Sequence, residues 1–148
     1  MNKKKKYSWK KFDKDVANLV RRIKYAKFKP KTIVALARGG LPFGVKLSHM
    51  LHTPLMIVSC KSYNEKKKQT NTVLLNSSYT VPLQSPILLV DEVADSGHTL
   101  KVVKEHFESL GVEVRTATLS YKKRSCEKPD WAMNIEEDDT WLIYPWEE

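Results

Sequence analysis

The fold of this 148-residue chain is decided by the stretch Ile87-Leu88-Leu89-Val90-Asp91-Glu92-Val93-Ala94-Asp95-Ser96-Gly97-His98-Thr99-Leu100. Its first four residues are apolar, and so short a run with β-branched residues at both ends is typical of a strand buried on both faces of a parallel sheet. We expect the carboxylates of Asp91 and Glu92 to end this strand. Helical spacing begins at Thr99, with an apolar face made of Leu100, Val103 and Phe107. The order is therefore strand, acidic polar loop, helix.

The loop between this strand and this helix suits a phosphate group. A loop that enters a helix presents unpaired backbone N–H groups and the positive end of the helix dipole. Gly97 lets the backbone approach a ligand closely, and the hydroxyls of Ser96 and Thr99 can donate to phosphate oxygens. The carboxylates of Asp91 and Glu92 would repel a phosphate, and a simple helix cap explains neither of them. We expect these two side chains to accept hydrogen bonds from sugar hydroxyls or to hold a hard divalent cation such as Mg²⁺.

The segment Val90 to Thr99 resembles the phosphoribosyl pyrophosphate (PRPP) signature of the type I phosphoribosyltransferases. The usual signature is two acidic residues, two apolar or small residues, Asp, Thr or Ser, Gly, any residue, and Thr or Ser. This chain departs from it at Glu92, where a second Asp is commoner, and His98 occupies the variable position. The resemblance implies that Asp95 is the catalytic base and that Asp91 and Glu92 take part in holding Mg²⁺.

A second candidate anion site is Arg38-Gly39-Gly40, which directly follows an apolar run. Paired glycines expose backbone amides, and the arginine adds a fixed cation; a tight turn alone would also explain the glycines. In the family this loop holds the pyrophosphate and often contains a non-proline cis peptide, here at Ala37-Arg38. The resemblance therefore implies a PRPP site made of Arg38, Gly39, Gly40, Asp91, Glu92, Asp95, Ser96, Gly97, His98 and Thr99.

The remaining periodicity predicts one α/β domain spanning residues 1–148. An amphipathic helix is expected from Trp9 to Phe28, buried strands at 32–37 and 54–59, a helix from Leu41 and an alternating strand at 112–119. Alternation of strands and helices predicts a parallel twisted sheet of about five strands with helices on both faces and ligands at the carboxyl ends of the strands. The resemblance adds a small hood made of a flexible loop and the C-terminal segment.

The net charge of +9 is concentrated at the N-terminus, where residues 1–31 hold 13 Lys or Arg and two Asp. Residues 1–6 are expected to form a flexible, solvated basic end; binding to nucleic acid or attraction of a polyanionic substrate are alternatives. Cys60 and Cys126 have no ligand-like spacing, so free thiols and no structural metal are expected. No apolar run suits a membrane span or a signal peptide, which predicts a cytoplasmic protein.

The polar, lysine-rich stretch that follows Ser62-Tyr63 is typical of a solvated hairpin tip. The resemblance implies more, because the family has a mobile hood loop here that commonly starts at a Ser-Tyr pair and closes over PRPP. We assign this loop to residues 62–74. Val73-Leu74-Leu75 and Tyr79 to Val81 are expected to form the returning strand and its turn.

The segment 122–148 is similar to the base-binding part of the xanthine-guanine phosphoribosyltransferase group. Lys122 follows a strand, and the chain ends in Asp139-Thr140-Trp141-Leu142-Ile143-Tyr144-Pro145-Trp146-Glu147. The resemblance implies that Lys122 donates to a purine 6-oxo oxygen, Trp141 stacks on the base and the Leu142 backbone reads its edge, with Glu147 as a further contact. A surface lysine and a core tryptophan are the alternative interpretations.

The function implied is purine salvage: Mg²⁺-dependent transfer of the phosphoribosyl group from PRPP to N9 of xanthine, guanine or hypoxanthine, by a homodimer or homotetramer. A nucleic-acid-binding regulator of the same fold, responsive to PRPP or nucleotides, is an alternative, although nucleic acid is an unlikely partner because the pyrophosphate-loop arginine is present. A phosphoribosyltransferase for adenine or a pyrimidine is the other alternative.

Overall fold

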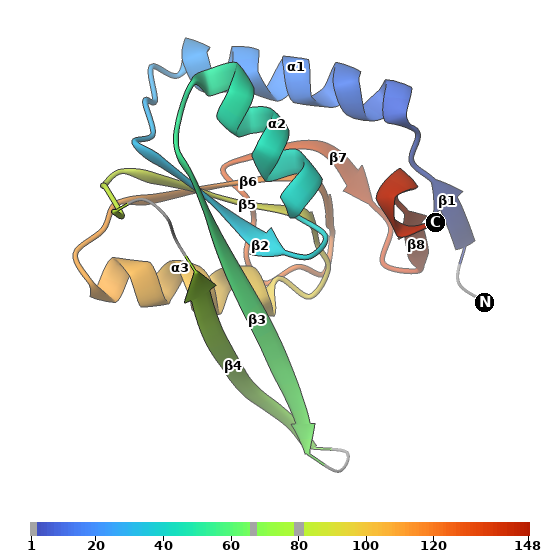
Figure 1. Ribbon diagram of the computed structural model, residues 1–148. Coiled ribbons are helices and arrows are strands. Elements are labelled where there is room, and N and C mark those ends of the chain that lie inside the picture. Colours follow the sequence, from blue (N-terminus) through green and yellow to red (C-terminus); the bar gives the residue numbers. More distant parts are fainter. Residues whose placement is uncertain (1–2, 66–67, 79–81) are drawn as a thin grey trace.

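The computed structural model describes residues 3–65, 68–78 and 82–148, and its centre is a six-stranded sheet with the order β4-β3-β2-β5-β6-β7 (Figure 1). The strands are β2 (Thr32–Ala37), β3 (Leu55–Glu65), β4 (Lys68–Ser78), β5 (Ile87–Ala94), β6 (Val114–Lys122) and β7 (Trp131–Glu136). The five strands β3, β2, β5, β6 and β7 are mutually parallel, and β4 adds an antiparallel edge to β3. The α/β fold with about five parallel strands is confirmed.

Helices cover both faces of the sheet (Figure 1). The helices α1 (Trp9–Tyr25) and α2 (Leu41–Leu51) pack on one face, and α3 (His98–Ser109) packs on the other. The central strands β2 and β5 contribute side chains to both hydrophobic clusters, which is why each reads as a continuous apolar run. Ser8 caps α1 by accepting a hydrogen bond from the Lys11 amide (3.1 Å), so the helix starts where the apolar periodicity starts.

The segment assigned to the hood loop, residues 62–74, contains strand rather than loop wherever the structure describes it. Strands β3 and β4 extend as an antiparallel hairpin away from the sheet (Figure 1), with Ser62 opposite Val73. The hairpin interpretation is confirmed, and β3 is longer than expected because pairing with β4 continues beyond residue 59. The expected turn at residues 79–81 lies outside the described residues.

A second, two-stranded sheet joins the two ends of the chain. Strand β1 (Lys3–Lys6) pairs in parallel with β8 (Thr140–Ile143), and a 3₁₀ turn, η1 (Pro145–Glu147), follows β8 (Figure 1). The lysine run was expected to be a flexible end, but Lys3–Lys6 form a strand, because their backbone groups find partners on β8 although all four residues are exposed. In the described part of the chain, no helix is long and apolar enough to cross a membrane.

Candidate active site at the carboxyl ends of the strands

The acidic pair, Asp91 and Glu92, lies inside β5. The sequence had led us to expect these two residues at the end of the strand. Pairing between β5 and β2 ends at Val90, whereas pairing with β6 continues to Ala94. Asp91 and Glu92 therefore sit where β5 projects beyond its neighbour β2. The backbone of β5 on the β2 side is therefore free of strand pairing at these two residues.

The turn from β5 into α3 forms a pocket of about 150 Å³. Gly97 adopts φ 78°, and a Cβ on it would lie 2.2 Å from Ser125 Oγ and 2.7 Å from the Glu127 amide nitrogen, so only glycine fits without displacement. The Ser96 hydroxyl faces the first amide of α3, with His98 N 3.3 Å from Ser96 Oγ. The residues lining the pocket are Asp91, Val93, Ala94, Asp95, Ser96, Gly97, Thr99 and Leu100. The turn combines backbone amides, hydroxyls and a helix N-terminus, the groups that bind phosphate.

The Arg38-Gly39-Gly40 loop packs directly against the acidic pair. The peptide bond Ala37-Arg38 is cis, which confirms the hypothesis drawn from the family. A Cβ on Gly39 would lie 2.1 Å from Glu92 Oε2, and a Cβ on Gly40 would lie 2.7 Å from the Leu36 carbonyl oxygen. The Cβ on Gly40 would also lie 3.0 Å from Asp91 Cα and from the Val90 carbonyl oxygen, so the backbones of β2 and β5 leave no room for a side chain there, whereas Gly39 lies against the movable Glu92 carboxylate. The two sequence motifs therefore form one continuous surface.

The carboxyls of Asp91 and Glu92 fit a hard divalent cation. Burial, followed by the neighbouring Glu92 carboxyl, raises the pKa of Asp91 well above its ordinary value. Glu92 Oε2 is buried and has no hydrogen-bond partner among the residues the structure describes. Two adjacent carboxyls, one with an unsatisfied oxygen, form a donor set that suits Mg²⁺.

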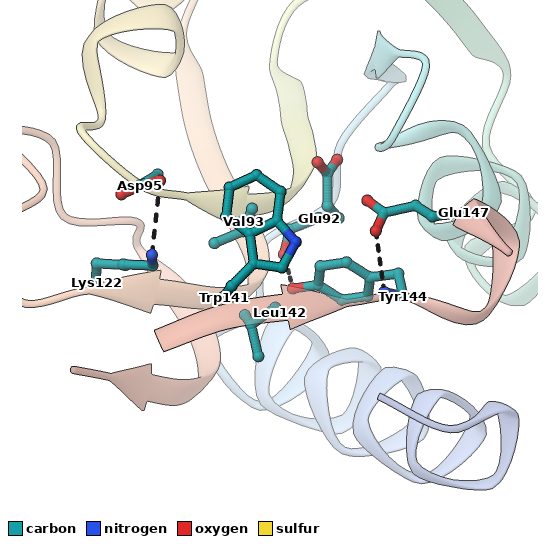
Figure 2. Close-up of a pocket in the computed structure, with 8 residues that line it drawn as sticks. All are labelled: Glu92, Val93, Asp95, Lys122, Trp141, Leu142, Tyr144 and Glu147. Atoms are coloured by element: carbon teal, nitrogen blue, oxygen red, sulfur yellow. Dashed lines mark hydrogen bonds and ion pairs between the residues drawn. The ribbon is translucent and has the colours of Figure 1, made fainter. Parts of the chain in front are cut away.

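A second pocket, of about 130 Å³ (Figure 2), shares Val93 and Asp95 with the first. Its lining combines the end of β5, the end of β6 and the C-terminal segment: Glu92, Val93, Asp95, Lys122, Trp141, Leu142, Tyr144 and Glu147. Lys122 is only 5% exposed, unlike an ordinary surface lysine, whereas Trp141 is 54% exposed, unlike a core tryptophan. The expected purine-binding residues Lys122, Trp141 and Leu142 thus line one cavity, together with Glu147.

Asp95 belongs to the lining of both pockets and faces two cations. Lys122 Nζ lies 3.6 Å from one carboxylate oxygen of Asp95 (Figure 2), and Arg124 Nε donates to the other at 2.9 Å. The hydrogen bond to Asp95 raises the pKa of Arg124 above its ordinary value. Sequence reasoning missed Arg124, because Lys122-Lys123-Arg124 reads as a solvated basic turn and the partner carboxylate lies 29 positions earlier.

Tyr144 is a second residue that sequence reasoning missed. It is almost completely buried, its hydroxyl donates to the Glu92 carbonyl oxygen (3.1 Å), and its amide donates to Glu147 Oε2 (3.2 Å; Figure 2). Its ring stacks on Trp146. Tyr144 therefore fastens the C-terminal segment to the strand that carries the acidic pair. The signal for it was present, because Tyr144 follows the end of β8 in the same alternate-residue pattern as the buried Thr140 and Leu142.

Comparison with known proteins places this geometry in one family. The family model for the phosphoribosyl transferase domain matches residues 6–147. The xanthine-guanine phosphoribosyltransferase of Cereibacter sphaeroides is 29% identical over 119 residues, which cover 79% of this chain and 69% of that protein.

Two solved structures share the fold over nearly the whole chain. The purine phosphoribosyltransferase of Pyrococcus horikoshii superposes with a TM-score of 0.83 and 30% identity, covering 98% of this chain and 95% of that one. The xanthine-guanine-hypoxanthine phosphoribosyltransferase of Helicobacter pylori gives a TM-score of 0.84 at 24% identity, covering 97% and 94%.

Proposed function

This chain belongs to the phosphoribosyltransferase family, and from that premise we propose that it transfers the 5-phosphoribosyl group of PRPP to N9 of a 6-oxopurine, with release of pyrophosphate. The acceptor is xanthine, guanine or hypoxanthine. The names of the relatives, which are purine phosphoribosyltransferases, support the choice of base.

The observation that carries the proposal is the position of Asp95 in the lining of both pockets. One pocket has the amides and hydroxyls that suit a 5-phosphate, and the other has a planar indole, a buried ammonium and a backbone edge that suit a purine. A transfer between two ligands requires their reacting atoms to meet. The shared boundary of the two pockets is where the anomeric carbon and N9 would meet.

The PRPP side of the site is divided among three groups of residues. The turn Asp95 to Thr99 binds the 5-phosphate, Asp91 and Glu92 accept hydrogen bonds from the ribose hydroxyls, and Arg38 with the amides of Gly39 and Gly40 holds the pyrophosphate. Asp91 and Glu92 would also hold Mg²⁺, which supplies positive charge that stabilises the leaving pyrophosphate.

The base side of the site selects a 6-oxopurine. The Lys122 ammonium can only donate hydrogen bonds, so it favours a 6-oxo oxygen over the 6-amino group of adenine. The indole of Trp141 covers one face of the base, and the backbone of Leu142 contacts its edge. Adenine would instead turn a 6-amino donor toward the ammonium, where two donors cannot form a hydrogen bond with each other.

Asp95 acts as the general base. As the bond between the anomeric carbon and the pyrophosphate oxygen breaks, N9 forms the new bond to that carbon, and the Asp95 carboxylate takes the proton from N7. Both carboxylate oxygens face a cation in the ligand-free protein, Lys122 on one side and Arg124 on the other. When the 6-oxo oxygen recruits Lys122, one oxygen of Asp95 becomes available to accept the proton.

A substrate panel tests the proposal. Purified protein is incubated with PRPP and Mg²⁺ and, in separate reactions, with guanine, xanthine, hypoxanthine or adenine, and nucleotide formation is measured by chromatography. Nucleotide from at least one 6-oxopurine and little or none from adenine is the expected result. Nucleotide from adenine alone, or from none of the bases, would refute the proposed acceptor.

A further inference from the structure

The N-terminal lysine strand β1 has no role in the proposed reaction, although it lies beside the base pocket. It pairs with β8, the strand that carries Trp141 and Leu142, with Lys4 opposite Trp141 and Lys5 opposite Leu142. Hydrogen bonds run from the Lys3 amide to the Asp139 carbonyl (3.0 Å) and from the Tyr7 amide to the Ile143 carbonyl (2.9 Å).

The parallel register determines which backbone groups of β8 remain for a ligand. In a parallel ladder, alternate residues direct their N–H and C=O toward the partner strand. The hydrogen bonds at Lys3 and Tyr7 show that every second residue of β1, and therefore Lys5, directs its amide toward β8. The amide of Lys5 faces the carbonyl of Trp141. On β8, the backbone groups of Trp141 and Ile143 point toward β1. The backbone groups of Leu142 point the other way, and Leu142 lines the pocket. Pairing with β1 thus leaves the Leu142 edge for the base.

The side chain of Lys5 connects β1 to β7, the neighbour of the strand that carries Lys122. Its Nζ lies 2.9 and 3.1 Å from the two carboxylate oxygens of Glu136, which is almost completely buried at the end of β7. Glu136 pairs in register with Lys122 on β6. The backbone of Lys5 pairs with β8, the strand that carries Leu142. The side chain of Lys5 contacts β7, the strand that pairs with β6 and so helps to position Lys122.

The end of β1 is fixed by a buried aromatic contact. Tyr7 is almost completely buried, its hydroxyl donates to Asp15 on α1, and its ring lies 4.9 Å from that of Tyr144. Tyr144 in turn donates to the Glu92 carbonyl oxygen on β5. The Lys5 side chain and the C-terminal end of β1 are therefore held by the domain core, so the strand can hold β8 in place.

We propose that β1 is a positioning element of the base site and that Lys5 is its central residue: the strand sets the distance between the Leu142 backbone and the Lys122 ammonium. The inference rests on the proposed function, because it assigns the purine to this pocket. It gives the basic N-terminus a role in substrate binding that does not require nucleic acid.

A pair of proline variants tests this role. Lys5→Pro removes a backbone amide that faces β8. Lys4→Pro is the matched control: it removes the same charge and introduces the same ring, but the amide of Lys4 faces away from β8. Proline is tolerated on an edge strand at such a position. Lys5→Pro loses the backbone hydrogen bond to β8 and also the contact between the Lys5 ammonium and Glu136. We therefore expect it to raise KM for the purine about thirtyfold, about tenfold from the hydrogen bond and about threefold from the ion pair, with KM for PRPP almost unchanged. Lys4→Pro is expected to stay near the wild-type values.

Two further measurements keep the test decisive if Lys5→Pro folds poorly. Lys5→Ala keeps the amide and loses only the contact with Glu136, and we expect it to raise the purine KM about threefold. Amide hydrogen exchange reports the strand itself: the amides of Trp141 and Ile143 should be protected in the wild type and in Lys4→Pro, and lose protection in Lys5→Pro.

The possible failures are distinguishable. A wild-type protein that forms no nucleotide from any purine would refute the proposed function. An active wild type in which the Lys5 variants leave the purine KM unchanged, or raise both KM values equally, would overturn the role of β1 alone.

Discussion

Replacing Asp95 with asparagine should separate catalysis from folding. The substitution keeps the shape of the side chain and removes its charge, so it disturbs the ion pairs with Lys122 and Arg124. The Asp95 side chain is 42% exposed and that of Arg124 is 51% exposed, and an ion pair so accessible to water contributes up to about 1 kcal/mol. Lys122 is buried, but it keeps two acceptors after the substitution, the Asp138 carbonyl oxygen (3.4 Å) and the amide oxygen of the new asparagine. We therefore expect the free energy of unfolding to fall by no more than about 1 kcal/mol.

The effect on turnover should be much larger. An asparagine amide cannot take the proton from the purine, and loss of a general base lowers kcat by about 10²- to 10⁴-fold. This loss corresponds to roughly 3 to 5 kcal/mol in the activation barrier. PRPP binding should be preserved, because the backbone amides and hydroxyls of the phosphate pocket remain and one negative charge beside it disappears.

The assay compares kcat for guanine with the dissociation constant for PRPP, measured by calorimetry on the same preparations. Asp138→Asn is a matched control, because its carboxylate accepts a hydrogen bond from the Arg124 amide (2.9 Å) but lines neither pocket. We expect that control to turn over guanine at nearly the wild-type rate. An Asp95→Asn protein with wild-type kcat, or one that loses PRPP affinity and kcat in parallel, would refute the assignment of Asp95 as the base.

Three further substitutions test other parts of the site. Gly97→Ala forces a side chain onto φ 78° and against Ser125, so it should cost about 1–2 kcal/mol in thermal unfolding from backbone strain alone and weaken PRPP binding in calorimetry; unchanged binding would contradict the phosphate role. Lys122→Met keeps the buried stem but removes the donor, so the preference for guanine over adenine in kcat/KM should fall at least about tenfold; an unchanged preference would remove Lys122 from base selection. Because the pKa of Asp91 is raised in the folded state, the folded protein keeps the Asp91 proton at pH values above the unfolded-state pKa of about 3.9. The contribution of Asp91 to the free energy of unfolding is therefore complete below that pH and is lost as pH rises through the folded-state pKa. Asp91→Asn should therefore stabilise the ligand-free protein more at pH 8 than at pH 4 in thermal unfolding, and an equal change at both pH values would contradict this interpretation.

The strands and helices that could be predicted are those in which the pattern of apolar residues shows which faces of the element are buried. Thr32–Ala37 is a continuous apolar run because both faces of the central strand β2 are covered, and the periodicity of Trp9 to Phe28 reflects one buried face of α1, which ends at Tyr25. Strand β1 could not be found in this way. Four lysines show no apolar alternation, and the strand exists because its backbone pairs with β8 and Tyr7 anchors its end.

The candidate site was predictable where chemistry follows a local motif. The turn Asp95 to Thr99 and the Arg38-Gly39-Gly40 loop each carry their own signal, and the structure brings them together. Contacts made across the sheet carried no local signal. Arg124 reaches Asp95 from the turn after β6, and Lys5 reaches Glu136 from the other end of the chain, so only the folded arrangement connects these residues.

The measurement that tests phosphoribosyl transfer most directly follows both products at once. Wild-type protein is mixed with PRPP, Mg²⁺ and guanine, and the reaction is monitored by phosphorus NMR. We expect guanosine 5′-monophosphate and pyrophosphate to appear in equal amounts as PRPP disappears. Pyrophosphate without nucleotide, or PRPP that stays intact with guanine and in parallel mixtures with xanthine and hypoxanthine, would contradict the transfer.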